Sequence, residues 1–158
     1  MRLTLYTDYS LRVLLYLAVR PDRLSSTAEI ARAYGVSQNH LTKVVHDLRH
    51  AGYVASVRGR FGGIRLARPA GEIVVGDVVR HTEDDFRLAG CDRCVIAPAC
   101  GLSGALDEAL AAFMAVLDGY RLADLAAKRG ELADLLGMGG DRARRLRRAA
   151  RGGPRRSR

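Results

Sequence analysis

The sequence lacks any long hydrophobic run. None of its apolar stretches reaches the roughly 18–20 residues that a helix needs to cross a bilayer. Its first residues also lack the layout of a signal peptide, in which a charged segment precedes an apolar one and a small-residue cleavage site. These absences predict a cytoplasmic protein without a membrane partner. There is no internal repeat, and 158 residues, of which 48% are hydrophobic, are enough for one domain with a core.

Cysteine is scarce, because Cys91, Cys94 and Cys100 are the only three and fall within ten residues. An odd, clustered set suits structural disulfides poorly in a cytoplasmic chain, so metal binding or redox chemistry is the better interpretation. Thiolates suit zinc, copper(I) and iron–sulfur clusters. Zinc sites and clusters usually have four ligands, so a remote group would complete the set. A cluster with such a labile fourth position suits a sensor, while a zinc site and a thiol redox switch remain open alternatives.

A thiol oxidoreductase is the least favoured interpretation of these cysteines. Cys91 and Cys94 have the C-x-x-C spacing of such enzymes. A thioredoxin-like active site also needs a βαβ context, and no such pattern surrounds these residues. The sequence therefore predicts a protein that is not an enzyme.

Charge is distributed unevenly along the chain. Residues 1–70 hold eleven Lys and Arg against four Asp and Glu, whereas residues 71–140 hold six against twelve. A basic N-terminal part beside an acidic middle part indicates a polyanionic partner for the former. The last eighteen residues hold nine arginines and have the composition of a disordered tail, which either contacts phosphates or only solubilises the chain.

Helical periodicity predicts a first helix over about 7–19 and a helix-turn-helix over about 28–51. A capping box from Ser26 to Glu29 would open the second helix. The turn contains Gly35, and we expect Ser37 to cap the third helix.

An alternating, β-branched segment follows, then a glycine-rich loop and a second short strand, which predicts a hairpin over about 54–66. A short helix is expected over 73–81, a loop over 90–101 and a long helix over about 102–120. The fold class is therefore mainly α with a small β-hairpin: a winged helix-turn-helix domain plus a long helix. We expect this domain to span residues 1–136 and an arginine-rich tail to span 137–158.

The order helix, turn, helix, hairpin is that of proteins that place the third helix in the major groove of double-stranded DNA. Gln and Asn pair with adenine, and Lys reaches guanine or phosphate. Arginines on a glycine-rich wing can approach the minor groove or the backbone. The predicted DNA-binding residues are Ser37, Gln38, Asn39, His40 and Lys43 of the helix, and Arg58, Gly59, Arg60 and Gly62 of the wing.

Several segments, taken in order over roughly residues 1–136, resemble the nitric-oxide-sensing NsrR repressors of the Rrf-two superfamily of winged-helix regulators. An ordered set of motifs is far more specific than any one of them. The motifs are Thr7-Asp8-Tyr9, the run from Tyr34 to Val45, Ala51-Gly52-Tyr53-Val54, the run from Val57 to Leu66, Gly76-Asp77-Val78-Val79-Arg80, the run from Ile96 to Leu102, and Leu122-Ala123-Asp124-Leu125.

The resemblance implies a homodimer that binds an imperfectly palindromic operator, with the long helix mediating dimerisation. It also implies one iron–sulfur cluster per subunit, of the 2Fe–2S or 4Fe–4S type, at the dimer interface. The cluster ligands would be Cys91, Cys94 and Cys100 together with Asp8 of the partner subunit. Nitric oxide would disrupt the cluster, lower the affinity for the operator and derepress genes of nitrosative stress.

The sequence departs from that family pattern in the cysteine loop and the tail. Only two residues separate Cys91 from Cys94, whereas the family has four or five there, while the five residues before Cys100 are normal. The shorter segment can change the geometry, type or stability of a cluster. Ser103 stands where the related iron–sulfur-biogenesis regulator has a histidine ligand, which argues against that relative. The arginine-rich tail has no counterpart in the family pattern.

Overall fold

The computed structural model describes residues 2–138 of the chain. It divides into two compact units, residues 1–127 and 128–158. The second unit contains one described helix, α7, at Arg129–Leu135. The predicted limit of the regulator domain at residue 136 stays a prediction, and nearly all of the predicted arginine-rich tail lies outside the described residues.

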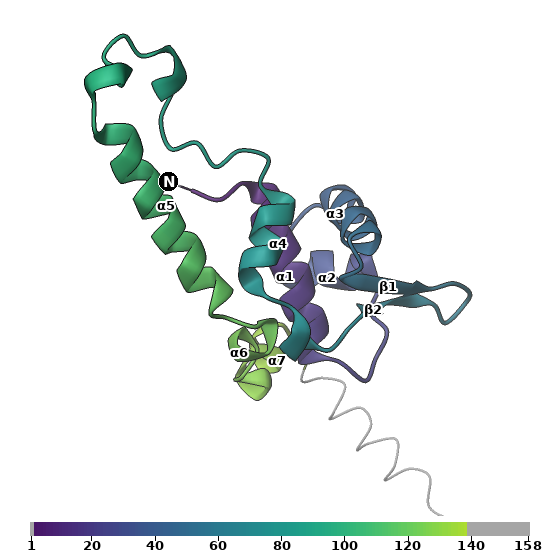
Figure 1. The fold of residues 1–158 in the computed structure, drawn as a ribbon. Coiled ribbons are helices and arrows are strands. Elements are labelled where there is room, and N and C mark those ends of the chain that lie inside the picture. Colours follow the sequence, from purple (N-terminus) through teal and green to yellow (C-terminus); the bar gives the residue numbers. More distant parts are fainter. Residues whose placement is uncertain (1, 139–158) are drawn as a thin grey trace, which may run out of the picture. The chain divides into compact units, whose positions relative to one another are not determined.

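The first unit is mainly helical with one small hairpin, as predicted (Figure 1). Its longer helices are α1 (Leu5–Val19), α2 (Thr27–Tyr34), α3 (Gln38–His50), α4 (Val75–Thr82) and α5 (Leu102–Asp118). The hairpin consists of β1 (Val54–Val57) and β2 (Gly63–Leu66), and the shorter pieces are η1 (Ala70–Glu72), η2 (Cys91–Arg93), η3 (Ala97–Ala99) and α6 (Leu122–Leu125). Within residues 2–138, no helix is long and apolar enough to cross a membrane.

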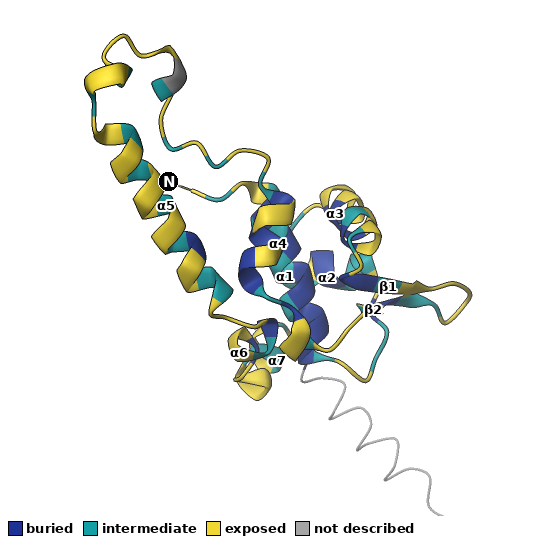
Figure 2. Cartoon of the chain, viewed as in Figure 1, coloured by how far each residue is buried: buried dark blue, intermediate teal, exposed yellow. Residues whose placement is uncertain are grey.

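Helix α1 forms the centre of the core. Its apolar residues recur every three or four positions, so that Val13, Leu14 and Leu17 lie on one face and are almost completely buried. This helix contacts α3, α4, α6 and β2. Figure 2 shows it as the most extensively buried helix of the unit. Thr4 caps its first turn by accepting a hydrogen bond from the backbone N–H of Thr7.

The helix-turn-helix is fixed by local signals at its first helix. The Ser26 hydroxyl accepts from the backbone N–H of Glu29, and the Glu29 carboxylate accepts from the backbone N–H of Ser26. The predicted capping box is therefore present. Helix α2 ends at Gly35, whose φ of 63° is a left-handed conformation that glycine adopts without strain.

The predicted cap of α3 is wrong in its chemistry. Ser37 occupies the N-cap position, but within the part of the chain that the structure describes its side chain makes no capping hydrogen bond. The helix starts without that bond because α2 and α1 pack against it and bury Leu41, Val44 and Leu48. The Ser37 hydroxyl thus remains at the exposed start of α3.

The hairpin is antiparallel, with Val54 opposite Leu66 and Val57 opposite Gly63. The Ser25 backbone N–H donates to the carbonyl of Ile64, and the Ile64 N–H donates to the carbonyl of Ser25, which ties β2 to the segment before α2. This tie holds the wing beside the helix-turn-helix.

Helices α4 and α5 lie side by side in the same unit (Figure 1). Arg80 donates to both carboxylate oxygens of Asp118, with N–O distances of 2.7 and 2.5 Å. At the lower end of α5 the backbone N–H of Val75 donates to the carbonyl of Tyr120, and that of Leu122 donates to the carbonyl of Ile73. The polypeptide between α4 and α5 carries the cysteine loop.

We expect Leu14→Ala to lower the free energy of unfolding by about 2–5 kcal/mol, because a fully buried leucine side chain would leave a cavity. Leu5, on the same helix, is 59% exposed and provides a matched control. Leu5→Ala should cost less than about 1 kcal/mol. Urea unfolding followed by circular dichroism measures both changes, and equal losses would contradict the central position of α1.

The capping box predicts a pH-dependent contribution to stability. Burial raises the pKa of Glu29, but the backbone hydrogen bond from Ser26 and the charge of Arg23 lower it more, so the pKa lies below its usual value. The carboxylate therefore stabilises the fold above the ordinary glutamate pKa, and this contribution is lost as the pH falls through the lowered pKa.

Glu29→Gln should accordingly cost on the order of 1 kcal/mol at neutral pH and much less in acid. Urea unfolding of both proteins at neutral and acidic pH measures the difference. Glu72→Gln, which removes an exposed carboxylate outside the capping box, is the control. A Glu29→Gln penalty that did not shrink on acidification would rule out the capping carboxylate as its source.

Candidate nucleic-acid interface and metal centre

The start of α3 presents an exposed polar surface. The face of this helix that carries Leu41, Val44, Val45 and Leu48 is buried, which turns the opposite face to solvent. His40 also stacks on the ring of Tyr9 from α1, with ring centroids 6.4 Å apart. The predicted helix residues are all exposed: Ser37, Gln38, Asn39, His40 and Lys43.

The wing loop presents cations, and its glycines serve two different purposes. Arg58 and Arg60 are exposed, and Gly59 has a φ of 113° that only glycine adopts readily. A Cβ atom at Gly62 would lie 2.3 Å from the carbonyl oxygen of Val57. Gly62 is therefore required for the wing to close on itself, whereas the sequence assigned it to a close approach to DNA.

A polar network connects α3 to α1 and α4. Asp47 of α3 makes a 2.9 Å contact between its Oδ2 and Nε2 of His81 at the end of α4. The hydroxyl of Tyr6 in α1 also hydrogen-bonds to Asp47. Burial of the Tyr6 ring is the main cause that raises the pKa of Tyr6 to about 12, and the bond to Asp47 is the second. Sequence reasoning missed all three residues. They lie 34 or more positions apart, and no local pattern links them.

The cysteine loop is built from two short 3-10 turns. The backbone N–H of Cys94 donates to the carbonyl of Cys91, and that of Cys100 donates to the carbonyl of Ala97. The thiols are free, with Cys94 exposed and the other two partly exposed. The predicted loop over 90–101 is thus an ordered segment that leads into the first residue of α5. It lies at the end of α5 that is remote from α6 (Figure 1).

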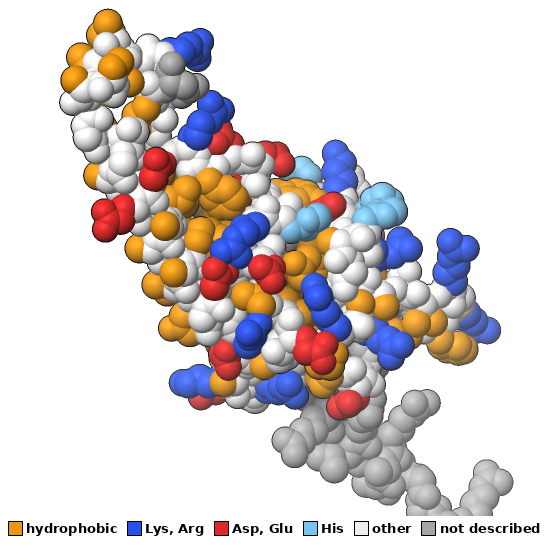
Figure 3. Space-filling model, viewed as in Figure 1, with side chains coloured by type: hydrophobic (Ala, Val, Ile, Leu, Met, Phe, Trp, Pro, Cys, Tyr) orange, Lys and Arg blue, Asp and Glu red, His pale blue; other side chains and the backbone are white. Residues whose placement is uncertain are grey.

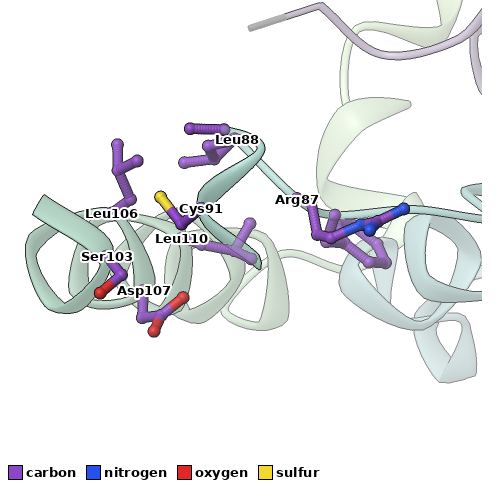
Figure 4. Close-up of a pocket in the computed structure, with 9 residues that line it drawn as sticks. Arg87, Leu88, Cys91, Ser103, Leu106, Asp107 and Leu110 are labelled. Atoms are coloured by element: carbon purple, nitrogen blue, oxygen red, sulfur yellow. The ribbon is translucent and has the colours of Figure 1, made fainter. Parts of the chain in front are cut away.

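Cys91 lines a cavity of about 290 Å³ between the loop and the first turns of α5. Figure 4 shows its sulfur near the side chains of Leu88, Leu106 and Leu110, and the polar side chains of Ser103 and Asp107 line the same cavity. The leucine side chains thus give the Cys91 thiol a partly apolar surrounding.

Asp8 lies in the first turn of α1 and forms an ion pair with Arg12, with an N–O distance of 2.8 Å. Both side chains are more than a third exposed, so the pair contributes little to stability. In Figure 1 the first turn of α1 is well separated from the cysteine loop. One chain therefore does not bring Asp8 to its own cysteines.

The cysteine loop carries the kind of ligand that iron–sulfur clusters use, because three uncrosslinked thiols fall on one short segment. It is one ligand short of four. Across residues 2–138, the single chain also gathers no group of three or more His, Cys, Asp or Glu that could hold a metal ion. A cluster with four protein ligands would need a fourth ligand, and a closer arrangement of the thiols, that the described residues of one chain do not supply.

One face of α5 is apolar and exposed. The periodic apolar positions of the sequence here are Leu102, Leu106, Leu110, Phe113 and Leu117, and the last four are half-buried against the rest of the unit, whereas Leu102 is exposed. The other row, with spacings of three and four, consists of Leu102, Ala105, Ala109, Ala112 and Val116, all exposed. Figure 2 shows how little of this helix is buried.

The Rrf2 family, described as iron-dependent transcriptional regulators, matches residues 3–128. The HTH-type transcriptional regulator NsrR of Bacillus subtilis is 51% identical over 144 residues, which cover 87% of this chain and 99% of that protein. The protein aau3 of Rhizobium meliloti is 48% identical over 143 residues, covering 87% and 93%.

Solved structures agree with the fold. The global cysteine regulator CymR of B. subtilis superposes with a TM-score of 0.66 at 28% identity, covering 81% of this chain and 98% of that one. IscR of T. potens superposes with a TM-score of 0.68 at 27% identity, covering 81% and 88%. These similarities confirm the predicted winged-helix fold and the prediction that the chain is a regulator and not an enzyme. The chain belongs to the Rrf2 family of transcriptional regulators, and within it to the NsrR group.

Proposed function

We propose that the protein is a homodimeric repressor that binds an imperfectly palindromic DNA operator and releases it in response to nitric oxide. An iron–sulfur cluster in each subunit controls this binding. The genes that the protein represses are those of the response to nitrosative stress. The observation that carries the DNA-binding part is the exposed start of α3 beside a cationic wing, both in the basic part of the chain. A regulator of this kind acts in the cytoplasm, where bacterial DNA lies.

The residues of α3 and the wing have separate roles in this proposal. Gln38 and Asn39 offer amide groups at the start of α3, where they can pair with base edges in the major groove. Ser37, His40 and Lys43 add donors on the same surface. Arg58 and Arg60 lie on the tip of the wing, where phosphates or a narrow minor groove attract them. Gly59 and Gly62 shape that tip.

The exposed apolar row of α5 supports a second copy of the chain as its partner. Alternating spacings of three and four residues give the seam of an antiparallel or parallel helix pair. The alanines in the middle of the row allow a close approach of two such helices. A symmetric dimer places the two α3 helices on successive major-groove faces of a palindrome.

The cysteine loop and α1 supply the proposed cluster ligands. Cys91, Cys94 and Cys100 provide three thiolates, and Asp8 of the partner subunit provides the fourth ligand. Asp8 can be recruited at small energetic cost because its ion pair with Arg12 is exposed. When bound, a 2Fe–2S or 4Fe–4S cluster supplies iron that reacts with nitric oxide.

A zinc- or thiol-based regulator of the same family is the alternative. It is favoured by the short segment between Cys91 and Cys94, and by the exposure of the Cys94 thiol. Zinc prefers four ligands that include thiolates, and an exposed thiol is open to oxidation.

The contact roles predict different responses to substitution. Lys43→Ala and Arg60→Ala should weaken binding to all DNA sequences, and each should reduce the salt slope of a dimer by about 2. Gln38→Ala should instead weaken binding to the operator by about 1–3 kcal/mol and relax the preference at one base pair in each half-site. Fluorescence anisotropy with operator and scrambled DNA at several salt concentrations measures both effects.

Arg121→Ala is the control for these DNA measurements. It removes an exposed arginine beside α6, away from α3 in the same unit (Figure 1). Its salt slope should equal that of the unaltered protein. Equal slopes for Lys43→Ala, Arg60→Ala and the unaltered protein would show that these cations do not contact phosphates.

Anaerobic purification tests the sensing part of the proposal. We expect a brown protein with iron and sulfide in equal amounts, and operator binding that falls when nitric oxide is added. Cys100→Ser should abolish the iron and sulfide content, and Asp8→Ala should lower it while leaving the helical content unchanged. A colourless protein that contains zinc, or a brown one that binds its operator equally with and without nitric oxide, would overturn the proposal.

A further inference from the structure

The chain has four histidines, of which three lie on α3 and the fourth, His81, lies near the end of α4. Figure 3 shows histidine side chains on the surface over α3 and the adjacent end of α4. Two of them have other partners, since His81 contacts Asp47 and His40 stacks on Tyr9. The remaining two, His46 and His50, are exposed and lie one turn apart on the second half of α3.

His46 and His50 turn the same ring atom toward each other. Their Nε2 atoms are 3.3 Å apart, and their ring centroids are 4.5 Å apart with a tilt of 57°. The two rings share a hydrogen bond at this separation, which lies at the long end of the usual range for such bonds. Two nitrogen ligands of a tetrahedral zinc ion, each about 2.0–2.1 Å from the metal, lie about 3.3–3.4 Å apart. The pair therefore has the separation of a chelating ligand pair.

We propose that His46 and His50 form a second metal site, which binds a divalent cation of the imidazole-preferring class, with Zn²⁺ as its representative. Both rings are exposed, so a cation bound between the Nε2 atoms keeps positions for water. The protein supplies two ligands to this site, because within residues 2–138 no group of three or more His, Cys, Asp or Glu could hold a metal.

The site lies on the surface that would face DNA. Asn39, Lys43, His46 and His50 follow one another at spacings of four, three and four, which places them along one exposed stripe of α3. A bound dication therefore adds positive charge at the end of the same stripe that carries Lys43. The site is separate from the cysteine loop, and its existence does not depend on the proposed cluster.

The metal and protons compete for the same nitrogen atoms. Binding of Zn²⁺ needs both imidazoles neutral, so the affinity falls as the solution is acidified. Other charged or titratable groups of α3 near the pair are Asp47 and Arg49, and Asp47 is already in contact with His81 from α4. The site should also stabilise the folded protein, since the unfolded chain does not hold the two rings together.

Zinc titration of the full chain, with Cys91, Cys94 and Cys100 replaced by serine to remove the thiols, tests the site. Imidazole ¹⁵N NMR spectra should show the Nε2 resonances of His46 and His50 shifting together at a one-to-one ratio of Zn²⁺. Those of His40 and His81 should not shift. The same titration on the unaltered chain with alkylated thiols serves where the serine variant folds poorly.

His46→Gln and His50→Gln should each weaken Zn²⁺ binding at least about tenfold, because loss of a direct ligand costs no less than loss of an outer partner. Each should also abolish the rise in thermal midpoint that Zn²⁺ produces. Arg49→Gln, an exposed change on the same turn, should alter neither. The proposal is overturned if only one of the two imidazoles responds, or if either glutamine variant binds Zn²⁺ as tightly as the parent.

Discussion

The packing of α1 is the constraint on which the rest of the first unit depends. One face of this helix is buried against α3, α4, α6 and β2 at once. The positions of α3, of the hairpin strand β2 and of α4 are therefore all set by packing against one helix. Asp8 and Tyr9 lie in its first turns, and Tyr9 stacks on His40 at the exposed start of α3. A shift of α1 relative to its neighbours would move both the proposed fourth ligand and the proposed DNA-binding surface.

Helix α4 connects the two ends of the proposed regulator. Arg80 binds Asp118 of α5, and the adjacent His81 contacts Asp47 of α3. The cysteine loop follows α4 and precedes α5, so a change in the loop reaches both helices through the polypeptide itself. Neighbouring residues of one short helix thus contact the proposed dimer helix and the proposed recognition helix.

The sequence predicted best those features that depend on local chemistry. The capping box of Ser26 and Glu29, the glycine turn and the periodicity of α1 and α5 each follow from a few adjacent residues. The capping role of Ser37 failed because tertiary packing already fixes the start of α3. The structural role of Gly62 could not be predicted, because the clash that it avoids, with Val57, appears only when the wing is closed.

Contacts between distant segments could not be predicted for a different physical reason. Asp47 and His81 are 34 positions apart, and their meeting depends on how α3 and α4 both pack on α1. The proposed metal centre is a harder case, because across residues 2–138 the single chain brings no three potential metal ligands together. A site whose fourth ligand comes from another subunit leaves no geometric trace in one chain, and only the family resemblance points to Asp8.

Magnitudes indicate where the energy of a switch must lie. Moving a repressor from almost fully bound to almost fully released takes about 5.5 kcal/mol of bias between two states. The pairs that connect α4 to its neighbours, Arg80–Asp118 and His81–Asp47, are each more than a third exposed, and such pairs contribute about 0–1 kcal/mol. They can align α3 and α5, but they cannot drive the transition. In the proposed regulator, ligand bonds at the cysteine loop and apolar area buried along α5 would be the sources large enough, so the driving force of such a switch would come from the proposed dimer and not from the single chain.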